Sequence, residues 1–203
     1  MKDSKEIILN KLKSSNLEKD DLEIEAKPDN GFDCPHSLLD SFLERLESVS
    51  GKGFVINDCE EFARMIKTFS VEKKWEKIYC SDIELSVLLE NEEIVLLKEE
   101  PEKGNYDVAI TKCESLISLT GSVLVSSGNG SGRKVYVTPD VHVVYAGFSQ
   151  LKPFIKDGLK SVNNNPSWIG LITGPSRTAD IEKTLVLGAH GPKELLVFID
   201  KNC

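Results

Sequence analysis

The sequence predicts an α/β protein with a mostly parallel, Rossmann-like sheet that is flanked by helices and preceded by an N-terminal helical extension. Short apolar runs alternate with amphipathic helical stretches, which is the pattern of parallel strands joined by crossover helices. The 203 residues are 40% hydrophobic, which is enough for a sizeable core. An acidic, irregular stretch with Pro28 and Pro35 indicates a linker. We therefore divide the chain into residues 1–35, a helix and linker, and a domain over residues 36–203.

The first ninety residues or so are predicted to alternate helices and strands. An apolar stripe from Leu38 to Val49 follows the 3.6-residue period of a helix that packs on a core. Asn57-Asp58 offers an N-cap to the next helix, and Ser81 with Glu84 has the spacing of a capping box. The expected elements are helix 5–17, helix 38–49, strand 54–56, helix 57–69, strand 77–80 and helix 81–89.

The second half is predicted to be rich in strands. The glycine-rich segment 127–132 matches neither G-x-G-x-x-G nor G-x-x-x-x-G-K-[ST], and a strand rather than a helix is expected after it. A hairpin turn on Asn129-Gly130 therefore explains it better than a phosphate-binding loop. The expected strands are 107–111, 122–126, 134–138, 142–145, 168–173 (buried) and 195–199 (closing the sheet), with helical stretches at 150–162 and 179–187.

Charge and composition exclude several classes of function. The net charge is −8, with 25 Lys and Arg against 33 Asp and Glu, so no nucleic-acid or membrane-surface partner is expected. The five cysteines form no C-x-x-C, so we expect neither a metal site nor an iron–sulfur cluster on this chain. No apolar run reaches the ~20 residues of a membrane span, and the N-terminus has no signal-peptide core. These features favour a cytoplasmic protein.

The segment Gly174-Pro175-Ser176-Arg177-Thr178 is the strongest candidate for a binding site. It lies between a predicted strand and a predicted helix, where ligands of open α/β sheets collect and a helix N-terminus attracts anions. Its hydroxyls and guanidinium can donate hydrogen bonds to a carboxylate or a phosphate. Asp180 and Glu182 could instead neutralise the helix dipole, so a well-capped structural turn is an equal alternative.

None of the three histidines has metal-ligand spacing to another. His142 begins a predicted strand, and His190 lies in a Gly-Ala-His-Gly-Pro loop whose glycines permit close approach of the backbone. A lone histidine is more often a hydrogen-bonded structural group than a ligand or a base. Ser176, Asp180 and His190 are the residue types of a hydrolase triad, but the sequence lacks a G-x-S-x-G motif, which disfavours serine hydrolysis.

Several blocks of the sequence resemble the LUD domain, the family of lactate utilization protein C. Its C-terminal signature is matched by residues 173–182 and 185–192, and shorter blocks agree in order at 110–111, 119–122 and 137–144. The fold of this family is similar to that of ribose-5-phosphate isomerase, glucosamine-6-phosphate deaminase and the CoA transferases. The resemblance therefore implies a NagB/RpiA/CoA transferase-like fold for this chain.

The resemblance also implies a role in the cytosolic oxidation of L-lactate to pyruvate, as the component without an iron–sulfur cluster that works with iron–sulfur partner proteins. Whether the chain is an enzyme stays open, and the candidate catalytic residues are His142, His190, Asp180 and Glu182. The alternative is a stand-alone enzyme of the CoA transferase, sugar-phosphate isomerase or 5-formyltetrahydrofolate cyclo-ligase type. The residues expected to bind a small anionic or phosphate-bearing ligand are Thr120, Gly121, Ser122, Gly174, Pro175, Ser176, Arg177, Thr178 and Gly191.

One position departs from the family pattern. Members usually carry an acidic residue directly before Thr-Gly, whereas this chain has Leu119 before Thr120-Gly121. A CoA-transferase-like mechanism needs a nucleophilic carboxylate, so the departure weakens that mechanism here. Alternatively, the position is only structural and Leu119 packs.

Overall fold

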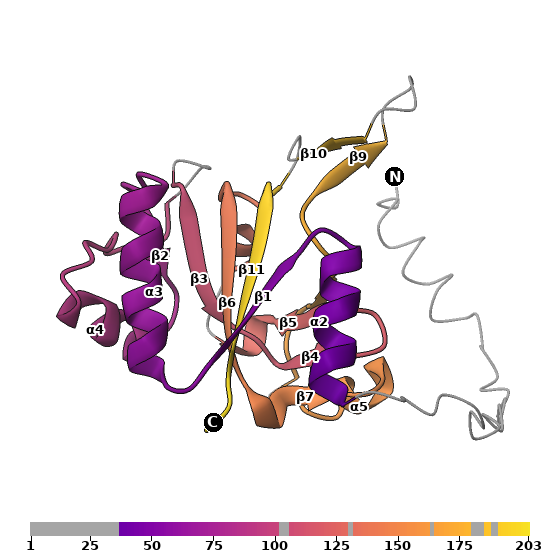
Figure 1. The fold of residues 1–203 in the computed structure, drawn as a ribbon. Coiled ribbons are helices and arrows are strands. Elements are labelled where there is room, and N and C mark those ends of the chain that lie inside the picture. Colours follow the sequence, from indigo (N-terminus) through magenta and orange to yellow (C-terminus); the bar gives the residue numbers. More distant parts are fainter. Residues whose placement is uncertain (1–36, 102–105, 130–131, 163–164, 180–184, 188–190) are drawn as a thin grey trace, which may run out of the picture. The chain divides into compact units, whose positions relative to one another are not determined.

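The centre of the fold is a five-stranded sheet in which all neighbouring strands are parallel (Figure 1). The computed structural model describes residues 37–101, 106–129, 132–162, 165–179, 185–187 and 191–203, which belong to one compact unit over residues 34–203. The predicted α/β fold with a mostly parallel sheet is confirmed. In sheet order the strands are β1 (Lys52–Ile56), β11 (Glu194–Asp200), β6 (Val141–Gly147), β3 (Val108–Lys112) and β2 (Ile78–Cys80).

A second sheet of four strands packs against one face of the central sheet. Strands β4 and β8 run antiparallel to β5, and β7 runs parallel to β4. A separate antiparallel ribbon is formed by β9 (Arg177–Ala179) and β10 (Leu185–Leu187). In order, the strands of the second sheet are β7 (Leu151–Lys152), β4 (Ser115–Ile117), β5 (Ser122–Ser126) and β8 (Ile169–Ile172).

Three of the helices begin at a side-chain cap, because a serine or aspartate oxygen accepts a hydrogen bond from a backbone N–H in the first turn. The cap of α3 is Asp58, as predicted, but the cap of α4 is Asp82 rather than Ser81. The helices are α2 (Leu38–Ser48), α3 (Cys59–Glu72), α4 (Ile83–Asn91) and the short α5 (Ile155–Leu159).

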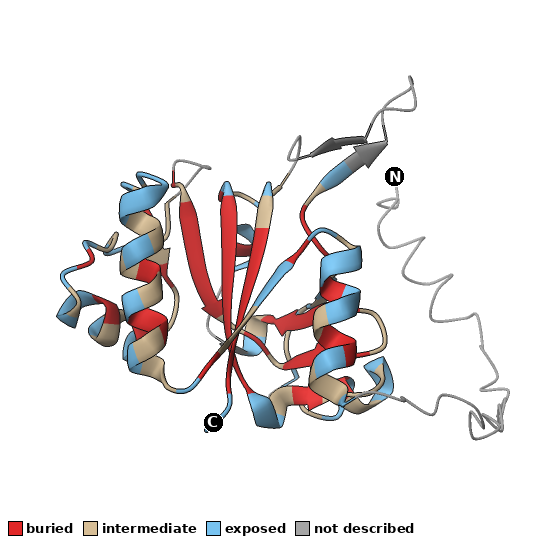
Figure 2. Ribbon diagram, in the orientation of Figure 1, coloured by how far each residue is buried: buried red, intermediate tan, exposed pale blue. Residues whose placement is uncertain are grey.

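Side chains of the central sheet alternate between two hydrophobic cores, one on each face. Strands β3, β6 and β11 are accordingly buried along most of their length (Figure 2). On β6, Val143 and Tyr145 face the core formed with α3 and α4, whereas Val144 and Ala146 face the core formed with α2 and the second sheet. Burial on both faces explains why β6 and β11 are continuous apolar runs. Because the strand period is two, His142 lies on the same face as Val144.

The backbone of α2 contacts the turn between β4 and β5. Gly121 in this turn has a φ of 62°, and a Cβ on it would overlap with the backbone of Arg45 and Leu46. Ser118 donates a hydrogen bond from Oγ to the carbonyl of Leu38, over 2.8 Å. Both the positive φ and the lack of space therefore require glycine at position 121.

The segment that follows β8 makes a second contact with the end of α2. Gly174 has a φ of 75°, and a Cβ on it would overlap with the carbonyl oxygen of Val49. Nη2 of Arg177 donates a hydrogen bond to the same oxygen. A cation is also favoured by the dipole at the C-terminal end of a helix. The two contacts place α2 against the turn between β4 and β5 and against the segment that leads from β8 to β9.

The strand expected at 134–138 is wrong, because Arg133–Tyr136 forms a 3₁₀ turn. The adjacent residues Val135 and Tyr136 are both buried, whereas a strand would send their side chains to opposite faces. The hairpin expected on Asn129-Gly130 is wrong as well, because it would have paired strand 122–126 with strand 134–138. The first of these, β5, pairs instead with β4 and β8 and is followed by another 3₁₀ turn.

The helix expected at 179–187 is also wrong. Its ends belong to the ribbon, in which Ala179 lies opposite Leu185 and Thr178 opposite Val186. A short apolar run such as Leu185–Leu187 is compatible with a helix or a strand. Its antiparallel pairing with Arg177–Ala179 makes it a strand. The segment at 174–178 therefore leads into a strand, and the argument from a helix N-terminus no longer applies to it.

Three smaller expectations change. The run 168–173 gives an edge strand, β8, whose side chains are alternately exposed rather than buried. The run 195–199 gives β11, which lies inside the sheet between β1 and β6 and does not close it. Only Ile155–Leu159 of the stretch 150–162 is an α-helix. The helix expected at 5–17 lies outside the described residues.

Replacing Gly121 by alanine tests the contact with α2. We expect Gly121→Ala to lower the free energy of unfolding by more than ~1 kcal/mol, because the new Cβ meets helix backbone at a positive φ. Urea denaturation measures this change. Gly132→Ala is the matched control, since Gly132 is exposed, has a φ of −67° and has only the Glu100 carboxylate near its Cβ position. Equal midpoints for the two variants would contradict the contact.

Candidate functional site

A cavity of about 240 Å³ lies between the two sheets, at the amino ends of β6 and β11. Most of its lining is apolar, and none of the described lining residues carries a charge at neutral pH. The residues that line it are Tyr136, Val137, His142, Leu171, Ile172, Thr173, Gly174, Ser176, Gly191, Pro192 and Leu195.

His142 is the fully buried polar residue of this wall. Its Nε2 lies 2.9 Å from Oγ1 of Thr111 on β3, and its ring packs edge-on against Tyr136 with 5.5 Å between ring centroids. The register partner on β3 is Ala109, whose small side chain leaves room for the imidazole. Nδ1 is buried and has no hydrogen-bond partner in the described part of the chain. Because buried polar atoms are nearly always paired, this nitrogen indicates a place for a ligand group or a water molecule.

Burial keeps the imidazole of His142 uncharged. Desolvation lowers the pKa of His142 from 6.5 to about 3, because the charged form would lose its hydration. At neutral pH the ring can therefore donate a hydrogen bond from one nitrogen and accept one at the other. It supplies no positive charge, so an anionic ligand in this cavity would depend on N–H and O–H donors.

Besides His142 and Tyr136, the polar part of the wall contains Ser176 and Thr173. The backbone N–H of Ser176 donates to the carbonyl of Pro192 over 2.8 Å, and a Cβ on Gly191 would lie 2.9 Å from Cβ of Ser176. Oγ1 of Thr173 lies 2.8 Å from Oγ of Ser122 on β5. The Ser176 hydroxyl has no partner among the described residues, so it is available to a ligand.

The structure brings four of the predicted site residues together. The cavity is lined by His142, Gly174, Ser176 and Gly191. Arg177 instead donates its hydrogen bond to the end of α2, and Thr178 lies on β9. The candidates Asp180, Glu182 and His190 lie outside the described residues. The predicted residues Thr120, Gly121, Ser122, Pro175 and Arg177 are not part of the described lining.

The position that departs from the family pattern lies in the α2-contacting turn. Leu119 is half-buried, and its backbone N–H donates to the carbonyl of Pro153 over 3.2 Å. The neighbouring Oγ1 of Thr120 is buried without a partner in the described residues. Neither residue is part of the described cavity lining, so a leucine at 119 leaves the polar groups of that wall unchanged.

Sequence reasoning missed Thr111 and Tyr136 as site residues. Tyr136 was hidden in an expected strand, and no spacing rule points to it. Thr111 carried a weak signal, because it is a polar residue directly after the apolar run Val108–Ile110 and shares a face with Ala109. Its proximity to His142 depends on the order of strands in the sheet, which the sequence did not provide.

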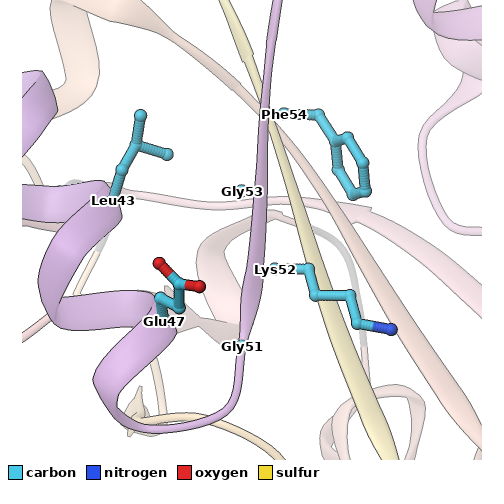
Figure 3. Close-up of a pocket in the computed structure, with 6 residues that line it drawn as sticks. All are labelled: Leu43, Glu47, Gly51, Lys52, Gly53 and Phe54. Atoms are coloured by element: carbon cyan, nitrogen blue, oxygen red, sulfur yellow. The ribbon is translucent and has the colours of Figure 1, made fainter.

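Two other hollows offer less to a ligand. One has a volume of 340 Å³ and lies between α2 and β1. It is lined by Leu43 and Glu47 on the helix and by residues 51–54 on the neighbouring chain segment (Figure 3). The other, of 440 Å³, is lined by lysines and carboxylates such as the pair Lys73–Glu194, whose charges compensate one another. Neither has a described lining residue with a buried, unpartnered polar atom.

The family follows from a comparison with known proteins. The family model of the LUD domain matches residues 39–199. The chain belongs to the LUD domain family. The resemblance in the signature blocks is thereby confirmed. Those blocks contain Gly121, Gly174 and Arg177 of the α2 contacts. They also contain part of the cavity lining, including His142, Ser176 and Gly191.

Curated LUD-related proteins are similar to part of this chain. Lactate utilization protein C of Geobacillus sp. (strain WCH70) is 37% identical over 93 residues, which are 42% of this chain and 39% of that protein. Lactate utilization protein C of Bacillus subtilis (strain 168) is 34% identical over 93 residues, with the same coverage. The match therefore spans about two fifths of the length of these relatives.

A solved structure supports the fold. A DUF162 family protein from Deinococcus radiodurans aligns with a TM-score of 0.59 and 19% identity, over 80% of this chain and 96% of that one. Ribose 5-phosphate isomerase A from Methanocaldococcus jannaschii aligns with a TM-score of only 0.31, which is too low to carry an argument.

The described residues contain neither a candidate membrane span nor a candidate metal site. None of the helices they form is both long enough and apolar enough to cross a bilayer. Within the same residues, no three His, Cys, Asp or Glu side chains are grouped as metal ligands would be.

The lowered pKa of His142 predicts how stability depends on pH. Between about pH 6.5 and pH 3 the unfolded chain protonates this histidine while the folded chain does not, so acidification favours unfolding. The contribution reaches ~1.4 kcal/mol per pH unit. We expect the difference in unfolding free energy between wild type and His142→Gln to shrink as the pH falls from 7 to 4. A difference that stays constant in urea titrations over this range would show that His142 protonates in the folded state.

Proposed function

We propose that this chain is a component of lactate utilization that binds a small organic acid in the His142 cavity. Membership of the LUD domain family and similarity to proteins named lactate utilization protein C support the first part. The observation that carries the second part is the unpartnered Nδ1 of fully buried His142 in the cavity wall. An unpaired buried nitrogen is costly, and a ligand atom that pairs with it removes this cost.

The size of the cavity favours an acid such as lactate or pyruvate over a complete phosphate-bearing cofactor. Its 240 Å³ corresponds to about eight water molecules at ~30 Å³ each. Cavities for drug-sized ligands have volumes of ~300–1,000 Å³. A nucleotide-sized cofactor could place only one end here. The apolar side chains, Leu171 and Leu195 among them, suit the methyl group of a short acid.

Oxidation of a 2-hydroxy acid needs an electron acceptor, and the sequence offers no recognisable site for one. It contains neither C-x-x-C nor G-x-G-x-x-G. We therefore assign the electron carriers to iron–sulfur partner proteins of a cytoplasmic system. In this assignment the present chain holds the acid, and its partners accept the electrons.

The alternative of a stand-alone enzyme acting on a sugar phosphate or an acyl-CoA has less support. Such ligands are larger and carry phosphate charge, whereas the described wall of the His142 cavity has no lysine or arginine. The guanidinium of Arg177, which the sequence suggested for this role, is engaged with the carbonyl of Val49.

Calorimetry on the purified chain tests ligand binding. We expect one site for pyruvate or L-lactate and no comparable binding of inorganic phosphate. His142→Gln should weaken binding about 10-fold or more, the effect of losing one hydrogen bond worth ~1.5 kcal/mol. Lys98→Ala, at an exposed position outside the cavity, should leave affinity unchanged. If neither acid binds the folded wild-type chain, or if both variants bind like wild type, the assignment of the cavity fails.

Turnover assays test the division of labour. The purified chain should not reduce artificial electron acceptors with L-lactate, because we assign the electron carriers to its partners. Addition of candidate iron–sulfur partner proteins should produce lactate-dependent reduction. Robust turnover by the chain alone would overturn this proposal, and an absence of any change on addition would favour the stand-alone enzyme.

A further inference from the structure

The contact between Thr111 and His142 determines which hydrogen-bonding atom the cavity presents. Both side chains are fully buried, and Oγ1 of Thr111 lies 2.9 Å from Nε2 of His142. Nε2 is the sole partner of this hydroxyl in the described part of the chain. Nδ1 on the other side of the ring has none. The arrangement of protons in this pair therefore decides whether Nδ1 donates or accepts.

Two arrangements satisfy the contact. In one, the Thr111 hydroxyl donates to Nε2, the imidazole carries its proton on Nδ1, and one buried donor, Nδ1–H, remains unpaired. In the other, Nε2–H donates to Oγ1, which leaves both the Thr111 O–H proton and the Nδ1 lone pair buried without partners. Each arrangement leaves one unpaired polar hydrogen. In the first it belongs to the ring that lines the cavity, where a ligand can pair with it, whereas in the second it belongs to Thr111, which is not part of the described lining. The second also leaves the Nδ1 lone pair unpaired, so the first arrangement is preferred.

We propose that Thr111 is a positioning residue that holds His142 as the neutral Nδ1–H tautomer, so that the cavity offers an N–H donor to a carboxylate or keto oxygen of its ligand. The identity of that ligand as a small organic acid rests on the proposed function, whereas the tautomer does not. The hydroxyl of Ser176, which also lines the cavity, can supply a second donor.

This arrangement specifies a class of ligand. A neutral imidazole that donates from Nδ1 pairs with oxygen acceptors and offers no acceptor to an alcohol proton. An acid or oxo acid therefore satisfies His142, whereas an uncharged diol of the same size gains less. Thr111 contributes without lining the cavity itself, since it acts on the far side of the ring.

The first test is the tautomer in the ligand-free protein. Long-range ¹H–¹⁵N correlation spectra of protein labelled with ¹⁵N-histidine distinguish the protonated ring nitrogen from the unprotonated one. The chain has three histidines, so His36→Gln and His190→Gln assign the signals while His142 stays intact. We expect His142 to be neutral with the proton on Nδ1 at pH 7. A proton on Nε2 would overturn the proposal whether or not any ligand binds.

The second test removes the hydroxyl while keeping the shape of the side chain. In Thr111→Val we expect the Nε2–H form of His142 to appear, whereas Thr111→Ser should retain the Nδ1–H form. Pyruvate should bind Thr111→Val about 10-fold more weakly than wild type, and Thr111→Ser should restore most of the affinity. If Thr111→Val folds and keeps both the wild-type tautomer and the wild-type affinity, Thr111 does not position the ring.

The ligand class is tested by a matched pair of probes. Pyruvate should shift the His142 Nδ1 resonance more than propane-1,2-diol does, because a carboxylate oxygen accepts a stronger hydrogen bond from Nδ1–H than a hydroxyl oxygen does. A larger shift with the diol would contradict the preference for an acid. If neither probe binds wild type, the proposed function fails, and the spectrum of the ligand-free protein still decides the tautomer.

Discussion

The backbone of α2 runs so close to two turns that each of them requires a glycine with positive φ, Gly121 in one and Gly174 in the other. The first turn joins β4 to β5, and the second follows β8, so α2 contacts chain segments next to three strands of the second sheet. Thr173, directly before Gly174, belongs to the cavity wall. The distance between the two sheets at the cavity is therefore linked to the position of α2. The hydrogen bond from Arg177 to the carbonyl of Val49 strengthens the contact between Gly174 and the end of this helix.

The chemistry of the cavity follows from what burial does to a single imidazole. In water the ring of His142 would be partly charged near neutrality, but desolvation lowers its pKa to about 3 and makes it a neutral hydrogen-bonding group. The apolar neighbours that cause this shift also form the cavity lining. A negatively charged ligand would thus bind through N–H and O–H donors of fixed direction. Selectivity would then depend more on the shape and the acceptor atoms of the ligand than on its net charge.

The fold could be predicted from the sequence wherever a hydrophobic pattern extended over enough residues to indicate one type of secondary structure. The stripe of α2 and the continuous apolar runs of β6 and β11 identified the central sheet and its helices. Prediction failed at residues 134–138 and 179–187, where short apolar runs fit a helix, a strand or a 3₁₀ turn equally well. The structure of the first depends on a partner distant in sequence, Trp168, whose ring packs against Tyr136.

The candidate site was predicted only in part, because residues 174–177 both contact α2 and line the cavity. The residue types alone do not show which residue does which. Gly174 and Arg177 carry the types expected for an anion loop, yet both contact the end of α2, while Ser176 between them belongs to the cavity. The same division explains Leu119. Leu119 lies in the turn that contacts α2 and outside the described lining of the cavity, so a leucine there leaves the described polar groups of the cavity in place.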